Sequence, residues 1–156
     1  MPDARRMDFA EKLEWIDKEY LSAYDAITLD SAVKEQAAFE KPKEISFPYP
    51  IASSESLTDN TYLSYNTVVG NVLDKELYLA FEVLEYALLN APGAPLKKAL
   101  IDAGIGKDIM GSYDNGIFQP IFSVISKNAN MEQKEDFIRV IEDTLKDIVK
   151  NGVDEK

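Results

Sequence analysis

The sequence contains no histidine and no cysteine among its 156 residues. The lack of histidine removes every Ser-His-Asp and Cys-His catalytic arrangement, together with the commonest ligand of transition metals. It also removes the zinc-peptidase motifs H-E-x-x-H and H-x-x-E-H, both of which need histidine pairs. The lack of cysteine excludes disulfides, thiolate nucleophiles and cysteine-based zinc or iron–sulfur sites. Carboxylate chemistry, lysine chemistry or no chemistry at all remains within these residues.

Basic residues are scarce, since 17 Lys and Arg stand against 28 Asp and Glu and leave a net charge of −11. Contacts to phosphate need lysine and arginine, so this balance predicts no nucleic-acid partner and no anionic membrane surface. The charge is compatible with basic peptides as ligands, although acidic surfaces more often only keep a protein in solution. The sequence also lacks an apolar run of the ~20 residues that span a bilayer, and Met1–Glu11 has no signal-peptide core. We therefore expect a soluble protein of a reducing compartment.

Apolar residues make up 46% of the chain, enough for a hydrophobic core. The length fits one domain of the usual ~100–200 residues. Asp8–Tyr24 is predicted to form an amphipathic helix with Asp8 as its N-cap. The apolar residues of this helix recur on one face: Phe9, Leu13, Ile16, Tyr20 and Tyr24.

The region from Asp25 to Asn60 is the least regular part of the sequence. A short helix is predicted over Asp30–Ala38. Ile45–Tyr49 alternates apolar and polar residues and predicts a short strand, which the prolines within Pro42–Pro50 confine to a sheet edge. The region is either a linker between two units or a long loop inside one domain.

The block from Leu73 to Ser126 organises the rest of the chain. A strand is predicted just before it, at Thr61–Val69, because Leu63, Tyr65, Thr67 and Val69 would face one way and the residues between them the other. Asp74 is predicted to cap a helix that runs to Asn90 and is apolar over most of its surface, so we expect this helix to be the covered central helix of the core. Pro95 suits the first position of a following short helix, which Gly104 ends.

A β-hairpin is predicted next, with strands Lys107–Asp114 and Ile117–Ser126 and a two-residue type I′ turn at Asn115-Gly116. Pro120 in the second strand indicates an edge position or a bulge. Asn130 and Gln133 have capping-box spacing at the start of a last helix. Helices and an antiparallel or mixed sheet in this order predict an α+β fold, a two-layer sandwich with helices on one face.

Two groups of carboxylates are candidates for chemistry. The first group is Asp102, Asp108 and Asp114. It offers the oxygen ligands that calcium and magnesium prefer, but its spacing does not match an EF-hand, and carboxylates are common in surface loops.

The second group is Glu11, Glu14 and Glu19 on the first helix. A solvated helix face has no pocket, whereas acid–base catalysis needs a carboxyl group whose pKa a pocket has shifted.

A glycine motif and an aromatic set complete the candidates. G-I-G at Gly104–Gly106 follows a helix rather than a strand, and it lacks the third glycine of a dinucleotide site and the G-K-[ST] of a P-loop. Aromatic residues of the predicted strands offer a surface, but such residues more often belong to the core. They are Tyr62, Tyr65, Phe118 and Phe122. The sequence thus predicts no catalytic, cofactor-binding or metal-binding residue.

Several segments nevertheless resemble one family, in the same order along the chain. They are L-E-W-I-D-K-E-Y-L-S-A-Y-D (Leu13–Asp25), F-E-K-P-K-E (Phe39–Glu44), D-K-E-L-Y-L-A-F-E-V-L-E-Y-A-L-L (Asp74–Leu89), P-L-K-K-A-L-I-D-A-G-I-G-K-D (Pro95–Asp108), F-S-V-I-S-K-N-A-N (Phe122–Asn130) and K-N-G-V-D (Lys150–Asp154). Together they resemble the pitrilysin/insulinase clan of zinc metallopeptidases, and within it the presequence proteases most. The motifs are structural rather than catalytic.

The resemblance implies a large peptidase of related α+β domains, similar to those of the mitochondrial processing peptidase, which close around a peptide chamber. Residues 1–43 would be the helical end of one domain plus a connector. Residues 44–156 would be the first part of the second, non-catalytic domain, incomplete at its C-terminus. Members of the family hold zinc with H-x-x-E-H and a distal Glu, so zinc is expected in the parent protein. No position of this histidine-free sequence can take those roles.

The resemblance favours a non-catalytic region of an intracellular zinc peptidase that helps to enclose unfolded peptides. Its partners would be the other domains of the parent chain and the peptide substrates, in the cytoplasm or an organelle matrix. The chain alone would be inactive, and a bare apolar face would favour self-association. The alternatives are a free-standing acidic α+β interaction module and a carboxylate-dependent metal enzyme.

Overall fold

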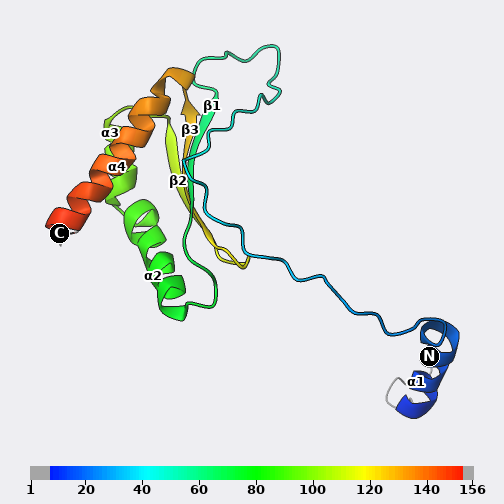
Figure 1. Ribbon diagram of the computed structural model, residues 1–156. Helices are drawn as coiled ribbons and strands as arrows, with labels where there is room; N and C mark the ends of the chain where they lie inside the picture. Colours follow the sequence, from blue (N-terminus) through cyan, green and yellow to red (C-terminus); the bar gives the residue numbers. More distant parts are fainter. Residues whose placement is uncertain (1–7, 153–156) are drawn as a thin grey trace. The chain divides into compact units, whose positions relative to one another are not determined.

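The computed structural model describes residues 8–152 and divides into two compact units, Met1–Lys34 and Glu35–Lys156 (Figure 1). Residues 1–7 and residues 153–156, which include the end of the K-N-G-V-D motif, lie outside the described range. No helix within residues 8–152 combines the length and the apolar character needed to cross a bilayer.

The first unit contains helix α1, Phe9–Ile16, which continues as one π-helical turn, η2, over Asp17–Leu21. The predicted cap is confirmed, because Asp8 Oδ1 accepts a hydrogen bond from the main-chain N–H of Ala10 at 3.0 Å. The helical segment ends at Leu21 and not at Tyr24. The apolar side chains of α1 and η2 are all exposed within this unit.

The region between η2 and the sheet forms no regular structure from residue 22 to residue 60. The helix predicted over Asp30–Ala38 is therefore wrong, and so is the strand predicted over Ile45–Tyr49. A short helix without a packing partner is marginal in water, because its first turn fixes several residues for one hydrogen bond. The prolines of Pro42–Pro50 remove main-chain donors that a strand would need.

The sheet of the second unit has three antiparallel strands in the order β1-β3-β2. They are β1 (Thr61–Val68), β2 (Asp108–Asp114) and β3 (Ile121–Ala129). The register places Tyr65, Val124 and Gly111 side by side across the sheet, and the next row on the same face is Leu63, Ser126 and Ile109. The predicted strand at Thr61–Val69 is confirmed to within one residue.

The helices of this unit cover one face of the sheet, as Figure 1 shows. They are α2 (Lys75–Glu85) with its π-helical extension η3 (Tyr86–Asn90), α3 (Pro95–Asp102), and the 3-10 turn η4 (Met131–Gln133) that leads into α4 (Lys134–Asn151). Asp74 caps α2, Pro95 begins α3, and Asn130 and Gln133 form the predicted capping box. The α+β fold predicted from the sequence is confirmed.

The core lies between this sheet face and the helices. It consists of Leu63, Leu88, Leu89, Leu96, Leu100, Ile105, Ile109, Val124, Ala129, Phe137 and Ile141. Leu89 packs closely over Gly111, where an added Cβ would lie 2.6 Å from Leu89 Cδ1. Only glycine allows η3 to approach β2 so closely, since real Cβ contacts are never that short.

The hairpin differs from its prediction. Asp114 pairs with Ile121, so the connecting loop spans residues 115–120 and the two-residue turn at Asn115-Gly116 is wrong. Main-chain hydrogen bonds hold this loop to the segment after β1, from Val72 N to Phe118 O at 2.9 Å and from Val69 N to Pro120 O at 3.0 Å. The edge position predicted for the second strand is also wrong, because β3 is the central strand. Pro120 lies just before β3 and therefore removes no hydrogen-bond donor from the ladder.

Helix α2 also differs from its prediction, because none of its residues is buried. The buried leucines of the predicted helix, Leu88 and Leu89, belong to η3. One side of α2 does meet the sheet, where the Phe81 ring lies 5.7 Å from that of Phe122. The opposite side has no cover among the described residues of this unit.

Candidate functional site

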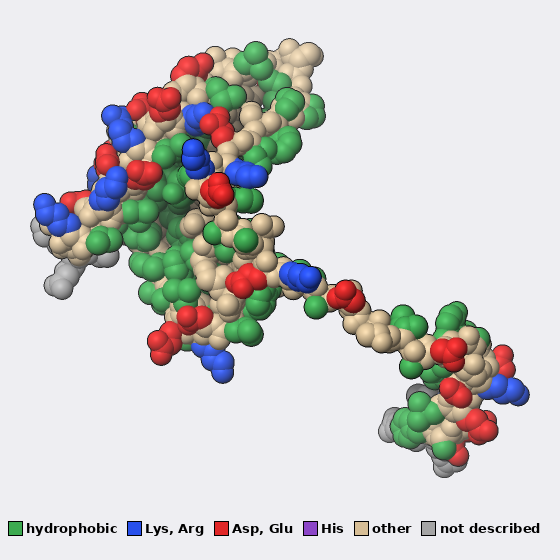
Figure 2. Space-filling view, viewed as in Figure 1, with side chains coloured by type: hydrophobic (Ala, Val, Ile, Leu, Met, Phe, Trp, Pro, Cys, Tyr) green, Lys and Arg blue, Asp and Glu red, His purple; other side chains and the backbone are tan. Residues whose placement is uncertain are grey.

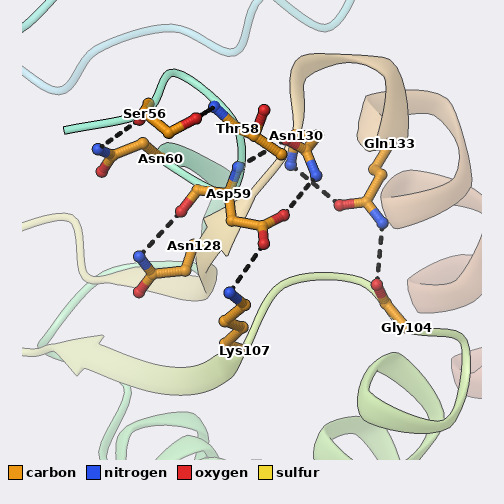
Figure 3. A network of polar contacts seen from close by, with 9 residues as sticks. All are labelled: Ser56, Thr58, Asp59, Asn60, Gly104, Lys107, Asn128, Asn130 and Gln133. Atoms are coloured by element: carbon orange, nitrogen blue, oxygen red, sulfur yellow. Dashed lines mark hydrogen bonds and ion pairs between the residues drawn. The ribbon is translucent and has the colours of Figure 1, made fainter.

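A polar network joins three loops at one end of the sheet (Figure 3). Its centre is Asp59, whose N–H donates to Asn130 Oδ1 at 2.8 Å and whose Oδ1 accepts from Asn130 Nδ2 at 2.8 Å. The Asp59 carbonyl accepts from Asn128 Nδ2 at 3.0 Å, and Lys107 Nζ lies 2.8 Å from Asp59 Oδ2. The loop before β1, the loop before β2 and the end of β3 are therefore held together.

Gln133 extends the network to the end of α3. Its Oε1 accepts from Asn130 N–H and its Nε2 donates to the Gly104 carbonyl, each at 2.9 Å. Asp59 and Asn128 both have φ of 56°, a left-handed conformation that Asp and Asn tolerate better than most residues. The network over-determines these conformations and so maintains them.

The hydrogen bond from Lys107 lowers the pKa of Asp59 below its ordinary value of 3.8, and the bond from Asn130 lowers it further. Asp59 is therefore ionised at neutral pH, with both carboxylate oxygens engaged. A general base needs a free oxygen near a reacting group. Asp59 therefore holds the loops in position and has no free oxygen for catalysis.

The three aspartates considered as metal ligands do not converge. Asp102 pairs with Lys98, and Asp108 lies 3.8 Å from Lys97 Nζ. Asp114 is at the other end of β2, about 20 Å from Asp108 at the usual ~3.4 Å per strand residue. Within residues 8–152 no three acidic side chains are grouped as a metal site would require.

The other sequence candidates are also dispersed. Glu11, Glu14 and Glu19 are exposed on α1 and η2. Gly104 and Gly106 both adopt φ of 69° in the loop between α3 and β2, and Ile105 between them is buried. This loop closes the core and presents no phosphate cradle at a helix start.

The aromatic candidates divide between the two faces of the sheet. Tyr65 and Phe122 pack against the core, as expected for strand aromatics. Tyr62 is on the opposite face, where its ring lies 5.6 Å from that of Tyr49 and 5.7 Å from Lys127 Nζ. Phe118 is partly exposed in the 115–120 loop. They form no single aromatic surface.

The feature least typical of a free surface is an apolar stripe on the outer side of α2, formed by Leu79, Val83 and Tyr86. Leu79 is 60% exposed and Val83 67% exposed. A hollow of about 340 Å³ lies beside the stripe, lined by Val72, Lys75, Tyr78 and Leu79. Figure 2 shows hydrophobic side chains gathered over this region. Such patches usually mark surfaces that another polypeptide covers.

The part of Asp59 and Lys107 in a polar site was not predicted from the sequence. The capping-box spacing identified Asn130 and Gln133, but only as helix caps. The available signal was T-D-N at Thr58–Asn60, since Asp and Asn favour the left-handed conformation just before a strand. Nothing in the spacing indicated that Asn130 would contact a residue 71 positions earlier.

The chain is similar to known proteins over most of its length. It is 49% identical over 149 residues to the protein HypA of Clostridium perfringens, covering 96% of this chain and 15% of that protein. It is 29% identical over 140 residues to presequence protease 1, chloroplastic/mitochondrial, of Arabidopsis thaliana, covering 87% and 13%. It is 25% identical over 145 residues to the mitochondrial presequence protease of Xenopus laevis, covering 91% and 14%.

The chain therefore spans about a seventh of the length of these curated relatives. The profile of one family, described as the peptidase M16 inactive domain, matches residues 7–156. That match covers both units, including α1, the core of the α+β unit and the Asp59 network. By this match, with the helix-covered antiparallel sheet and the histidine-free sequence, the chain belongs to the peptidase M16 inactive domain family.

Proposed function

We propose that this chain is a non-catalytic part of a zinc-dependent M16 peptidase, in which it helps to form the wall of a chamber that encloses unfolded peptides. The observation that carries the proposal is the match of the inactive-domain family over residues 7–156. The exposed α2 stripe supports it, because a wall segment has one side that packs on neighbouring parts of the same protein. The relatives named as presequence proteases support a peptide as the substrate.

The residues of this chain do not fit the family's zinc. The sequence has no histidine, and the acidic side chains of residues 8–152 form no metal cluster. In this proposal the chemistry takes place outside this chain. Its residues contribute position: the Asp59 network fixes the sheet end, and α2 presents the stripe.

The domain assignment follows from the same proposal. Residues 1–43 would be the end of a preceding domain with its connector, and residues 44–156 would belong to the non-catalytic domain. The net charge of −11 would favour basic peptides over acidic ones. The place of action would be the cytoplasm or an organelle matrix. The names of the two presequence proteases place those relatives in mitochondria or chloroplasts.

A peptidase assay tests the proposal. The pure 156-residue chain, with zinc added, should not cleave a panel of unfolded basic peptides. Turnover by this chain that survives purification to homogeneity would overturn the non-catalytic role. The surrounding gene sequence separates the proposal from a free-standing interaction module. H-x-x-E-H encoded in the same reading frame supports the peptidase, and start and stop codons at these two ends support the module.

A further inference from the structure

The side chain of Gln119 pairs with the main chain of a residue far away in sequence. Gln119 Oε1 accepts a hydrogen bond from the Gln36 main-chain N–H at 2.7 Å, and Gln119 Nε2 donates to the Gln36 carbonyl at 3.0 Å. Both residues belong to the second unit. One carboxamide thus satisfies both main-chain groups of one extended residue.

The Gln119 carboxamide contacts only the main-chain groups of Gln36. Two residues of an antiparallel ladder exchange the same two N–H···O=C bonds, and a carboxamide reproduces one side of that exchange. The Gln36 side chain takes no part, because its Nε2 donates to the Ala37 carbonyl. Any non-proline residue in an extended conformation presents the same donor and acceptor.

Gln119 itself is held firmly. It lies between Phe118 and Pro120, whose carbonyls accept main-chain hydrogen bonds from Val72 and Val69. Pro120 is fully buried, and β3 begins directly after it. The carboxamide is therefore presented from a fixed part of the fold, which reduces the entropy lost when it binds a partner.

The segment that contains Gln36, by contrast, is held only weakly. Among the described residues, 37–43 make no hydrogen bond to the rest of the α+β unit, and the next attachment is the exposed ion pair of Glu44 with Lys134. Such a pair contributes about 0–1 kcal/mol. Ile45 is 69% exposed and Phe47 81% exposed, so no side-chain pocket holds this segment.

We propose that Gln119 is a binding point for the main chain of an extended peptide, and that such a peptide takes the place of Gln36. The ligand class is unfolded polypeptide of any local sequence, with one non-proline residue paired to the carboxamide. The inference rests on the proposed function, since it names a residue of the wall that would contact the enclosed peptide. The connector residues 35–43 act as the resident occupant that this peptide displaces.

Amide hydrogen exchange on the 156-residue chain tests the pairing. The Gln36 amide should exchange more slowly than its neighbours Ala37 and Ala38. Gln119→Leu keeps the size of the side chain and removes both bonds, so Gln36 exchange should accelerate by roughly threefold to tenfold, the effect of losing a modest hydrogen bond. Unchanged exchange at Gln36 in this variant would overturn the pairing.

Gln133→Leu is the matched control, because Gln133 also uses both ends of its carboxamide on main-chain groups. It should destabilise the fold without a selective effect on Gln36. An equal acceleration at Gln36 in Gln133→Leu, which keeps Gln119, would mean that general opening, and not loss of the Gln119 pairing, explains the exchange.

Peptide probes test the binding itself. A synthetic peptide with the sequence of residues 31–42, and a second with the same residues in scrambled order, should both shift the Gln119 side-chain NH₂ resonances and speed Gln36 exchange at millimolar concentration. The peptide N-methylated throughout its main chain, which has lost its donors, should do neither. In Gln119→Leu the same peptides should leave the main-chain amide resonances of Phe118 and Ile121 unshifted. Shifts of these amides that persist in Gln119→Leu, shifts of the wild type from the native order alone, or no shift at all would overturn the inference. These results leave the peptidase assay and the gene context untouched, so failure here and failure of the proposed function are distinguishable.

Discussion

Helices α2 and α4 cover the same face of one sheet, but they differ in where their apolar residues lie. In α4, Phe137 is 2% exposed and Ile141 1% exposed, while the outer side pairs Lys146 with Glu142 and Arg139 with Asp136. In α2 no residue is buried, and the outer side carries the apolar stripe Leu79, Val83 and Tyr86. The outer side of α4 therefore has the polar character of a helix side that faces water, whereas the outer side of α2 has the apolar character typical of a covered helix.

The difference extends to the helix ends. The capping box of Asn130 and Gln133 at the start of α4 is tied to Asp59, Lys107 and Gly104. The start of α2 has a single side-chain cap, Asp74 Oδ1 to the Leu77 N–H at 3.0 Å. The far end of α2 is anchored through η3, where Leu89 rests on Gly111. We expect this contrast to appear in stability measurements.

The largest effect is expected on α4. Phe137→Ala should lower the free energy of unfolding by about 3–5 kcal/mol, because it leaves a cavity in the core. Leu79→Ala on α2 should change it by no more than about 0.5 kcal/mol, since that side chain lies on the surface. Urea denaturation of both variants measures the difference, and similar losses would contradict the comparison.

The contact between η3 and β2 should follow. Gly111→Ala is expected to cost about 1–3 kcal/mol, because the new methyl group meets Leu89. Leu89→Ala alone should cost about 2–5 kcal/mol through the cavity that it creates. The double variant should be less destabilised than the sum of the two, as residues that share space are coupled. Strict additivity in denaturation curves would show that the two side chains do not compete for this space.

A smaller, pH-dependent effect is expected for Asp59→Asn. The pKa of Asp59 is lowered by the fold, so its ionised form stabilises the folded state above pH 3.8, and this contribution is lost as the pH falls through the lowered pKa. The stability of the wild type should exceed that of Asp59→Asn at pH 7, and the difference should shrink in acid. Thermal unfolding between pH 7 and pH 2 measures it.

Lys107→Gln provides the control for this pH profile. It removes the largest cause of the lowered pKa, so the contribution of ionised Asp59 to stability should be smaller than in the wild type and should be lost over a narrower pH range just below 3.8. An identical acid profile in the wild type, Asp59→Asn and Lys107→Gln would show that the ion pair is not coupled to folding.

The smallest effect on stability, and the most direct test of the α2 stripe, is expected for Leu79→Ser with Val83→Ser. The free energy of unfolding should change by no more than about 1 kcal/mol for two surface sites. Sedimentation velocity should show self-association of the wild type that the double variant reduces, because the exposed stripe seeks cover. Val149→Ser removes an apolar residue of α4 that is even more exposed, at 87%, but lies outside the stripe, and it should leave association unchanged. A monomeric wild type at high concentration would argue against the stripe as a contact surface.

Local chemistry made many elements of the fold predictable. Asp8, Asp74 and Asn130 cap helices where their spacing indicated, and Pro95 begins α3. These signals act over a few residues, so no distant contact is needed to interpret them. The same reasoning failed at the hairpin, where bonds from Val69 and Val72 to the 115–120 loop outweigh the turn preference of Asn115-Gly116.

The sequence by itself determined the order of the helices and strands from residue 61 onward, the antiparallel α+β class and the absence of histidine and cysteine chemistry. Periodicity and capping are local, and a missing residue type is missing wherever the chain folds. Only the tertiary structure decided which side of α2 meets the sheet, that β3 is the central strand, and that Asp59 and Gln119 find partners 71 and 83 positions away. Such contacts depend on which surfaces of the folded chain meet, and the spacing of residues along the chain does not predict this.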